Sequence, residues 1–192
     1  MLTVEAKAAR RMGLTPNMIS AIGIVLAFLA ALAYAEWQNS ISYLLIATIF
    51  LLLSGFCDAL DGIVARFYEK TTPFGGFLDS LLDRYADAAV FVGIIIGGLS
   101  DKLPGLVAIV GSLLVSYSRA RAEAAGLKLE SVGLAERAER MIILAVASVV
   151  AFFWQPTTVI NAAIILLAVL SNLTVLQRSL YVYNKSKKKE IN

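Results

Sequence analysis

Residues 58–66 read Asp-Ala-Leu-Asp-Gly-Ile-Val-Ala-Arg, and residues 75–83 read Gly-Gly-Phe-Leu-Asp-Ser-Leu-Leu-Asp. Each stretch lies at the edge of a long apolar segment, so the sequence places four carboxylates beside helices of membrane-spanning length. An ionised side chain at membrane depth is costly unless it is paired, and a divalent cation is a natural partner for several carboxylates. These two stretches decide both the expected fold and the expected chemistry.

The rest of the chain is too apolar for an ordinary water-soluble domain. Hydrophobic residues make up 59% of the 192 residues, and the mean hydropathy is +0.77. A helix needs about 20 apolar residues to cross a bilayer. The pattern therefore predicts an all-α integral membrane bundle of six transmembrane helices, over residues 17–35, 41–66, 75–99, 103–125, 136–154 and 157–182.

The ends of the chain differ from this core in composition. Residues 1–14 fit a short amphipathic helix lying in the membrane interface, and residues 185–192 form a basic tail. We expect residues 15–184 to make up a single six-helix domain. We expect no short cleavable signal before it, because the first apolar segment belongs to the series.

Basic residues are concentrated in alternate connections of the chain. They precede the first segment, follow the second, surround the junction of the fourth and fifth, and end the chain, whereas the other loops contain Glu36, Asp101 and Lys102 and little else that is charged. The positive-inside rule therefore places both termini and the carboxylates at the cytoplasmic face of the cell membrane. Nucleic acid is not an expected partner, since there is no soluble basic domain with interleaved aromatic residues.

The spacing of the four aspartates predicts a metal centre. Residues three or four apart on a helix share a face, so Asp58 points with Asp61 and Asp79 with Asp83, and the short connection lets the two pairs meet. Oxygen ligands suit Mg²⁺ or Mn²⁺, and a zinc–thiolate cluster is excluded because Cys57 is the only cysteine. Two ions would neutralise four carboxylates and would form the two-metal arrangement used for displacement at phosphorus.

Other residues of the same stretches allow two interpretations each. Arg66 either holds phosphate oxygens or pairs with an aspartate. Gly62 and Gly75 either permit close approach of a ligand or simply permit close helix packing. A purely structural salt-bridge cluster is the less favoured interpretation of the four aspartates, because few basic residues lie at that depth.

Together these residues resemble the signature of the CDP-alcohol phosphatidyltransferases, an enzyme family. Eight positions across 26 residues match it: Asp58, Asp61, Gly62, Ala65, Arg66, Gly75, Asp79 and Asp83. The resemblance implies metal-dependent transfer of a phosphatidyl-type group from a CDP-linked lipid to an alcohol, with release of CMP. It also implies that Asp58, Asp61 and Asp79 bind the metals, and that Asp83 is a further ligand and the general base.

The resemblance extends to substrate contacts and assembly. It implies that Gly62, Arg66 and Thr72 contact the CDP group, with Gly75 beside them. The turn at residues 15–17, which ends in Asn17, would line the nucleotide pocket. The family likeness further implies a homodimer in contact with membrane lipids.

Two more stretches bear on the acceptor alcohol. Residues 116–123 (Ser-Tyr-Ser-Arg-Ala-Arg-Ala-Glu) and 132–140 (Val-Gly-Leu-Ala-Glu-Arg-Ala-Glu-Arg) look like the branch that makes phosphatidylinositol phosphate or archaetidylinositol phosphate. In that branch CDP-diacylglycerol or CDP-archaeol is the donor and inositol 1-phosphate the acceptor. The expected pocket for the acceptor phosphate consists of Arg119, Arg121, Lys128, Arg137, Arg140 and Arg178. Alternatively, these basic side chains only touch lipid headgroups.

Three further functions stay open at this stage. The same chemistry could serve glycerol 3-phosphate, serine or unphosphorylated inositol as acceptor. A divalent-cation transporter would also need intramembrane acids, but it predicts them near mid-membrane on a through-going path, whereas these lie at one face. A purely structural membrane scaffold is less favoured still.

Overall fold

The computed structural model describes residues 13–68, 72–129 and 132–191, with the side chains of the last helix described to Lys187. Within these ranges the chain forms six long helices and one short 3₁₀ helix, and no strand. This confirms the predicted all-α fold. The amphipathic helix expected over 1–14 lies almost wholly outside the described residues.

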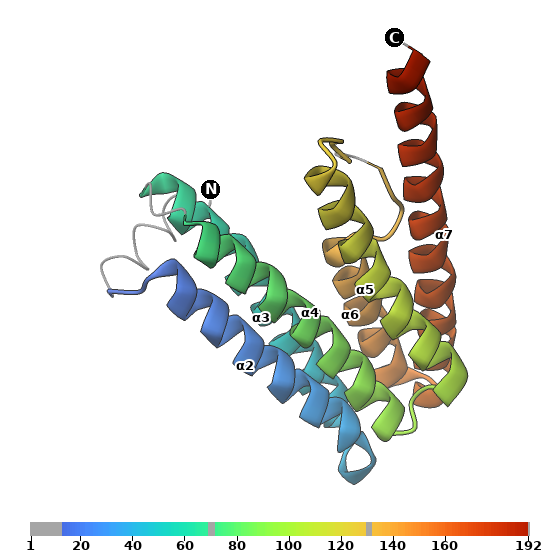
Figure 1. The fold of residues 1–192 in the computed structure, drawn as a ribbon. Coiled ribbons are helices and arrows are strands. Elements are labelled where there is room, and N and C mark those ends of the chain that lie inside the picture. Colours follow the sequence, from blue (N-terminus) through green and yellow to red (C-terminus); the bar gives the residue numbers. More distant parts are fainter. Residues whose placement is uncertain (1–12, 69–71, 130–131, 192) are drawn as a thin grey trace. The chain divides into compact units, whose positions relative to one another are not determined.

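The first half of the chain, through Gly97, is one compact unit. It contains α2 (Pro16–Ala35), η1 (Trp37–Asn39), α3 (Ser42–Phe67) and α4 (Pro73–Ile96). Figure 1 shows α2 running alongside α3 and α4, and the backbone of α2 packs closely against both. The N-terminal helix of this unit therefore holds the other two together.

The same local sequence starts α2 and α4. Thr15 and Thr72 are the N-cap residues, and each is followed by a proline at the first helical position. The N–H of Met18 donates to Thr15 Oγ1 (3.3 Å) and that of Gly75 to Thr72 Oγ1 (2.9 Å). A threonine cap satisfies an otherwise unpaired N–H, and proline loses nothing where no helical hydrogen bond is needed.

Glycine brings α4 very close to α2 at the far end of this unit. A Cβ at Gly93 would lie 2.2 Å from the carbonyl oxygen of Ala31, and one at Gly97 would lie 2.3 Å from that of Tyr34. Beyond this contact, Trp37 Nε1 donates to the Gly97 carbonyl (2.7 Å). The absence of side chains at Gly93 and Gly97 thus fixes the spacing of α2 and α4.

The second half, from Gly98 onward, is a separate compact unit. It contains α5 (Lys102–Ala124), α6 (Arg137–Phe153) and α7 (Pro156–Ile191), and α7 packs closely against both α5 and α6 (Figure 1). The helix expected over 157–182 is longer than predicted. Lysine continues a helix readily and no glycine or proline interrupts this segment, so α7 runs through most of the predicted tail.

Within the described residues, four helices are long and apolar enough to cross a membrane. They are α2, α3, α5 and the Pro156–Lys187 part of α7. Large apolar side chains such as Leu32, Ile96 and Phe153 are exposed on the helices, as expected for surfaces that face lipid. Of the other two predicted spans, α4 carries charged residues in its first half, and α6 has only 17 residues.

Candidate active site

Three carboxylates converge where α3 ends and α4 begins. Asp58 and Asp61 lie in the last turns of α3 and Asp79 lies in the second turn of α4. One carboxylate oxygen from each comes within 4.8 Å of the other two. Asp61 is the most enclosed, with 5% of its surface exposed, and the others are half-buried. As the spacing of the aspartates predicts, acids from two helices therefore lie close together.

Asp83 is one turn further along α4 and does not belong to this three-carboxylate group. Its Oδ2 lies 3.8 Å from Arg84 Nη1, which also donates to the Ser80 carbonyl. The predicted roles of Asp83 as a metal ligand and as a base therefore stay predictions.

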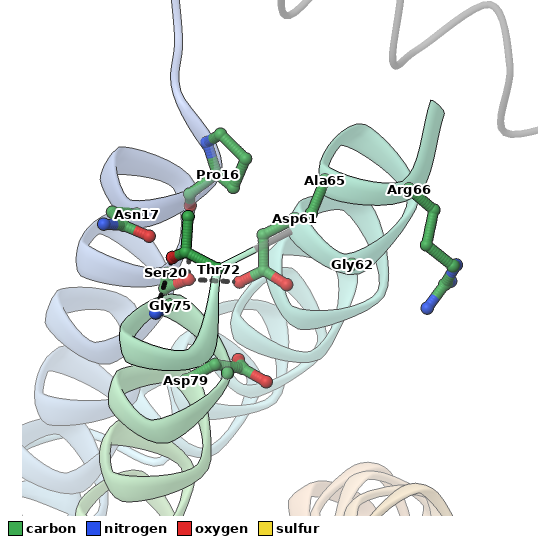
Figure 2. Close-up of a pocket in the computed structure, with 11 residues that line it drawn as sticks. Pro16, Asn17, Ser20, Asp61, Gly62, Ala65, Arg66, Thr72, Gly75 and Asp79 are labelled. Carbon is green, nitrogen blue, oxygen red and sulfur yellow. Dashed lines mark hydrogen bonds between the residues drawn. The ribbon is translucent and has the colours of Figure 1, made fainter. Parts of the chain in front are cut away.

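A pocket of about 180 Å³ lies beside the carboxylates, between the first turns of α2 and α4 and the last turns of α3. Figure 2 shows its lining: Pro16, Asn17, Ser20, Asp61, Gly62, Ala65, Arg66, Thr72, Gly75, Gly76 and Asp79. All five residues expected at the CDP group (Asn17, Gly62, Arg66, Thr72 and Gly75) are among them. The structure brings them together from three helices.

The pocket is electrostatically mixed. Two acids and Arg66 line it, and the N-terminal ends of α2 and α4 both border it. A helix N-terminus carries a partial positive charge and attracts phosphate. The side of the pocket formed by these helix ends thus suits an anion, whereas the carboxylate side suits a cation.

Gly75 and Gly62 have different neighbours. A Cβ at Gly75 would lie 3.0 Å from Thr72 Oγ1 and 3.5 Å from Asn17 Oδ1, so glycine leaves room for the cap and for the first turn of α2. At Gly62 the nearest atom is Arg66 Nη1, 3.4 Å from the position of a Cβ. The Arg66 guanidinium therefore lies along the bare backbone of Gly62.

Ser20 is a site residue that the sequence analysis missed. It lies on α2, lines the pocket, and donates a hydrogen bond to Asp61 Oδ2 (Figure 2). Its spacing of three residues from Asn17 places both on one helix face. That spacing could have drawn attention to Ser20, although nothing in the sequence pairs it with Asp61.

The three carboxylates fit a hard divalent cation. Their oxygens are the ligands that Mg²⁺ and Mn²⁺ prefer, and they lie close enough together to bind one ion in common. No nitrogen or sulfur ligand belongs to this group, which is unlike a zinc site. The donor set thus agrees with the predicted metal.

The basic residues expected at the acceptor phosphate lie in the second unit. Arg119 and Arg121 end α5, Lys128 follows in the loop, and all three are exposed; Arg137 and Arg140 begin α6. Arg119 Nε lies 3.0 Å from Glu123 Oε1, and Arg140 is buried and donates to the Ala135 carbonyl (2.8 Å). Both arginines lie close enough to Arg178 to repel its charge.

Arg178 differs from the expectation. Only 2% of it is exposed, and it donates to the carbonyls of Val115 (2.6 Å) and Val132 (2.8 Å) and to Glu136 Oε1 (3.2 Å). A guanidinium used in this way joins α5, α7 and the loop before α6. These bonds give Arg178 a part in holding that loop, and its predicted contact with the acceptor phosphate stays a prediction.

A helical membrane protein with clustered carboxylates next to two helix N-termini has the elements of a metal-dependent phosphotransferase. The sequence model of the CDP-alcohol phosphatidyltransferase family matches residues 13–182. The chain belongs to this family of membrane enzymes, and it is a multi-pass membrane protein.

Individual members of the family are similar over nearly the whole chain. The archaetidylinositol phosphate synthase of Methanothermobacter thermautotrophicus is 42% identical over 179 residues, which cover 93% of this chain and 88% of that protein. The crystal structure of Mycobacterium tuberculosis phosphatidylinositol phosphate synthase with CDP-DAG bound gives a TM-score of 0.80 at 32% identity, covering 95% of this chain and 94% of that one. The structure of the same enzyme in complex with manganese and citrate also gives 0.80 at 32% identity, over 95% and 89%.

Proposed function

We propose that this enzyme transfers an archaetidyl or phosphatidyl group from a CDP-linked lipid to inositol 1-phosphate and releases CMP. The observation that carries this proposal is the single pocket lined by two of the clustered carboxylates and by every residue expected at the CDP group. The similarity to synthases that make archaetidylinositol phosphate and phosphatidylinositol phosphate supports the acceptor.

In this proposal the donor binds by its phosphates. Arg66 and the N-terminal ends of α2 and α4 face the pocket and would hold phosphate oxygens. The cavity of about 180 Å³ is smaller than a typical ligand pocket of roughly 300–1,000 Å³. It therefore suits the diphosphate and part of the nucleotide, and the lipid chains would extend out along the apolar helix surfaces.

Asp58, Asp61 and Asp79 would hold Mg²⁺ or Mn²⁺, and two ions would require further ligands such as Asp83 and phosphate oxygens. When bound, such ions neutralise charge that develops on the transferred phosphate. Manganese in a similar crystallised enzyme supports a divalent metal here.

Asp83 is the proposed general base. It lies one turn from Asp79 on α4, and the chain has no histidine to compete for this role. The carboxylate would accept the proton of the acceptor hydroxyl as that oxygen attacks phosphorus and CMP leaves. The neighbouring Arg84 Nη1 lies 3.8 Å from Asp83 Oδ2.

The acceptor phosphate would be bound by basic residues of the second unit. Of the six expected, the exposed or half-buried ones (Arg119, Arg121, Lys128 and Arg137) are able to reach a ligand directly. Arg140 is 3% exposed, so it acts by its charge and by its hydrogen bond to Ala135. We further propose a homodimer whose termini and active site face the cytoplasm, with residues 185–192 near anionic headgroups.

An acceptor screen tests this function. Purified enzyme in detergent with Mn²⁺ and labelled CDP-archaeol or CDP-diacylglycerol is offered inositol 1-phosphate, glycerol 3-phosphate, serine or inositol, and CMP release is measured. We expect release with inositol 1-phosphate only, and loss of that release in Asp83→Asn. The higher identity to the archaetidyl enzyme predicts a preference for CDP-archaeol.

Two controls make the result interpretable. Arg137→Ala should raise the KM for inositol 1-phosphate while leaving the KM for the CDP-lipid unchanged. Equal turnover with glycerol 3-phosphate or serine would contradict the acceptor assignment, and full activity of Asp83→Asn would contradict the base.

A further inference from the structure

Ser20 joins α2 to the carboxylate cluster on the other two helices. Its Oγ lies within hydrogen-bonding distance of Asp61 Oδ2, which is 41 residues away in the chain, and 3.2 Å from the carbonyl oxygen of Pro16. A serine hydroxyl carries one proton, so it donates to one of these acceptors at a time. The shorter contact is the one to Asp61, and a carboxylate is the stronger acceptor.

The register of this contact is fixed by buried apolar neighbours. Ile19, next to Ser20, is buried against Leu60 and Val64, which flank Asp61 on α3. These contacts hold one turn of α2 opposite the turn of α3 that carries Asp61. Ser20 is therefore presented to Asp61 by packing, and its position does not depend on the hydrogen bond alone.

We propose that Ser20 is a positioning residue for Asp61: its hydroxyl holds one carboxylate oxygen and leaves the other directed at the metal. This inference rests on the proposed metal-dependent function. Groups that hydrogen-bond to metal ligands fix ligand orientation, and their removal typically weakens metal affinity by about 10–100-fold. Ser20 is suited to the role because it donates from a third helix, which packs against both ligand-bearing helices.

The hydroxyl also counteracts the charge repulsion that acts on Asp61 within this cluster. Asp58 and Asp79 lie close to Asp61 and repel its charge. Without a donor on Oδ2, the Asp61 carboxylate would be held less firmly against rotation away from its neighbours before a cation arrives. Ser20 adds this restraint to the hydrogen bond from the Gly62 backbone, so the site is arranged for the metal in advance.

The test measures metal binding apart from catalysis. Mn²⁺ is titrated into the metal-free enzyme without substrate, and free Mn²⁺ is followed by its electron paramagnetic resonance signal. The Mn²⁺ concentration that gives half-maximal CMP release is measured separately. We expect Ser20→Ala to raise the Kd for Mn²⁺ and the Mn²⁺ concentration for half-maximal CMP release, each about 10–100-fold. Activity should be restored at high Mn²⁺, and the KM for the CDP-lipid should change little.

Matched variants separate the hydroxyl from the shape of the side chain. Ser20→Thr keeps the hydroxyl and should bind Mn²⁺ nearly as the parent does. Valine has the shape of threonine but no hydroxyl, so Ser20→Val should bind Mn²⁺ as weakly as Ser20→Ala. Thr48→Val removes another hydroxyl from this unit, one that donates within its own helix (Thr48 Oγ1 to the Leu44 carbonyl, 2.8 Å), and should leave Mn²⁺ affinity unchanged.

Each outcome has one meaning. If Ser20→Ala and Ser20→Val bind Mn²⁺ as the parent does, Ser20 does not position Asp61, even if their turnover falls. If Ser20→Ala does not fold, the Thr and Val pair decides in the same way. If the parent enzyme itself binds no Mn²⁺, or if Asp61→Asn binds it equally well, the proposed metal centre fails, and with it the basis of the inference.

Discussion

At the scale of single residues, the carboxylate cluster opposes the stability of the protein until a cation binds. Asp58, Asp61 and Asp79 place their oxygens within 4.8 Å of one another. At an effective dielectric constant of about 20, two unit charges at that separation repel by roughly 3 kcal/mol. A bound divalent ion replaces this repulsion by attraction, so metal binding should also be visible as a gain in stability.

Thermal unfolding in detergent should show that gain. Mn²⁺ at about 100 times its Kd adds roughly 2.7 kcal/mol to the free energy of unfolding, which for a chain of this size raises the Tm by about 5–10 °C relative to EDTA. Asp79→Asn removes one like charge, so its Tm in EDTA should not be lower than that of the parent, but its shift with Mn²⁺ should be largely lost. Glu123→Gln, an exposed acid remote in sequence from the cluster, should keep the full shift. An equal Mn²⁺ shift in Asp79→Asn would contradict the three-carboxylate site.

At the scale of elements, the loop between α5 and α6 is held by side chains of α7. Arg178 donates to the Val132 carbonyl, and Thr174 Oγ1 accepts from the N–H of Leu134 (3.0 Å). Gly133 has φ +141, and a Cβ there would lie 2.6 Å from Thr174 Cγ2. The part of the loop around residues 132–134 is thus fastened to one face of α7, and it leads directly to the basic residues that begin α6.

Loss of the Arg178 hydrogen bonds should lower the free energy of unfolding much more than loss of a surface ion pair. Arg178→Ala removes a charged donor from the carbonyls of Val115 and Val132, and each bond to a charged donor contributes about 1.5–3 kcal/mol. We expect the free energy of unfolding to fall by at least 2 kcal/mol, measured by denaturant titration or by Tm. Arg119→Ala breaks the exposed pair with Glu123 and should change stability by about 1 kcal/mol or less. Similar losses in the two variants would contradict the structural role of Arg178.

At the scale of the whole molecule, charge distribution and apolar length together define how the chain enters a membrane. Of the described helices, four are apolar enough to span by themselves, whereas α4 carries charged residues in its first half and α6 begins with them. The charges of α4 include Asp79, a proposed metal ligand, and Asp83, the proposed base. The residues needed for the proposed function therefore make α4 less hydrophobic, although the predicted six-helix topology includes α4 as a span.

Single-cysteine labelling tests the predicted orientation. In a Cys57→Ala background, a cysteine introduced by Lys187→Cys should react with a membrane-impermeant maleimide only in inside-out vesicles. One introduced by Asp101→Cys should react in intact cells, because Asp101 lies in a loop expected on the outer side. Reaction of both positions from the same side would contradict the odd number of spans expected between Asp101 and Lys187.

Much of the site was predictable because its residues follow helical spacing. Asp58, Asp61 and Asp79, and the Thr-Pro pairs that start α2 and α4, are local patterns with local causes. The hydrogen bond of Ser20 to Asp61 was not predictable in this way, since it depends on how Ile19 packs against Leu60 and Val64. The hydrogen bonds of Arg178 were not predictable for a related reason: a buried arginine and one that binds phosphate look the same in sequence.

The packing of α2 against both α3 and α4 also has a consequence for biosynthesis. Every residue that lines the pocket, and every carboxylate of the cluster, lies between Pro16 and Asp83, within the unit that ends at Gly97. During translation these helices are synthesised before α5, α6 and α7. The catalytic half can therefore assemble and capture its cation while the half that carries the basic residues is still being made.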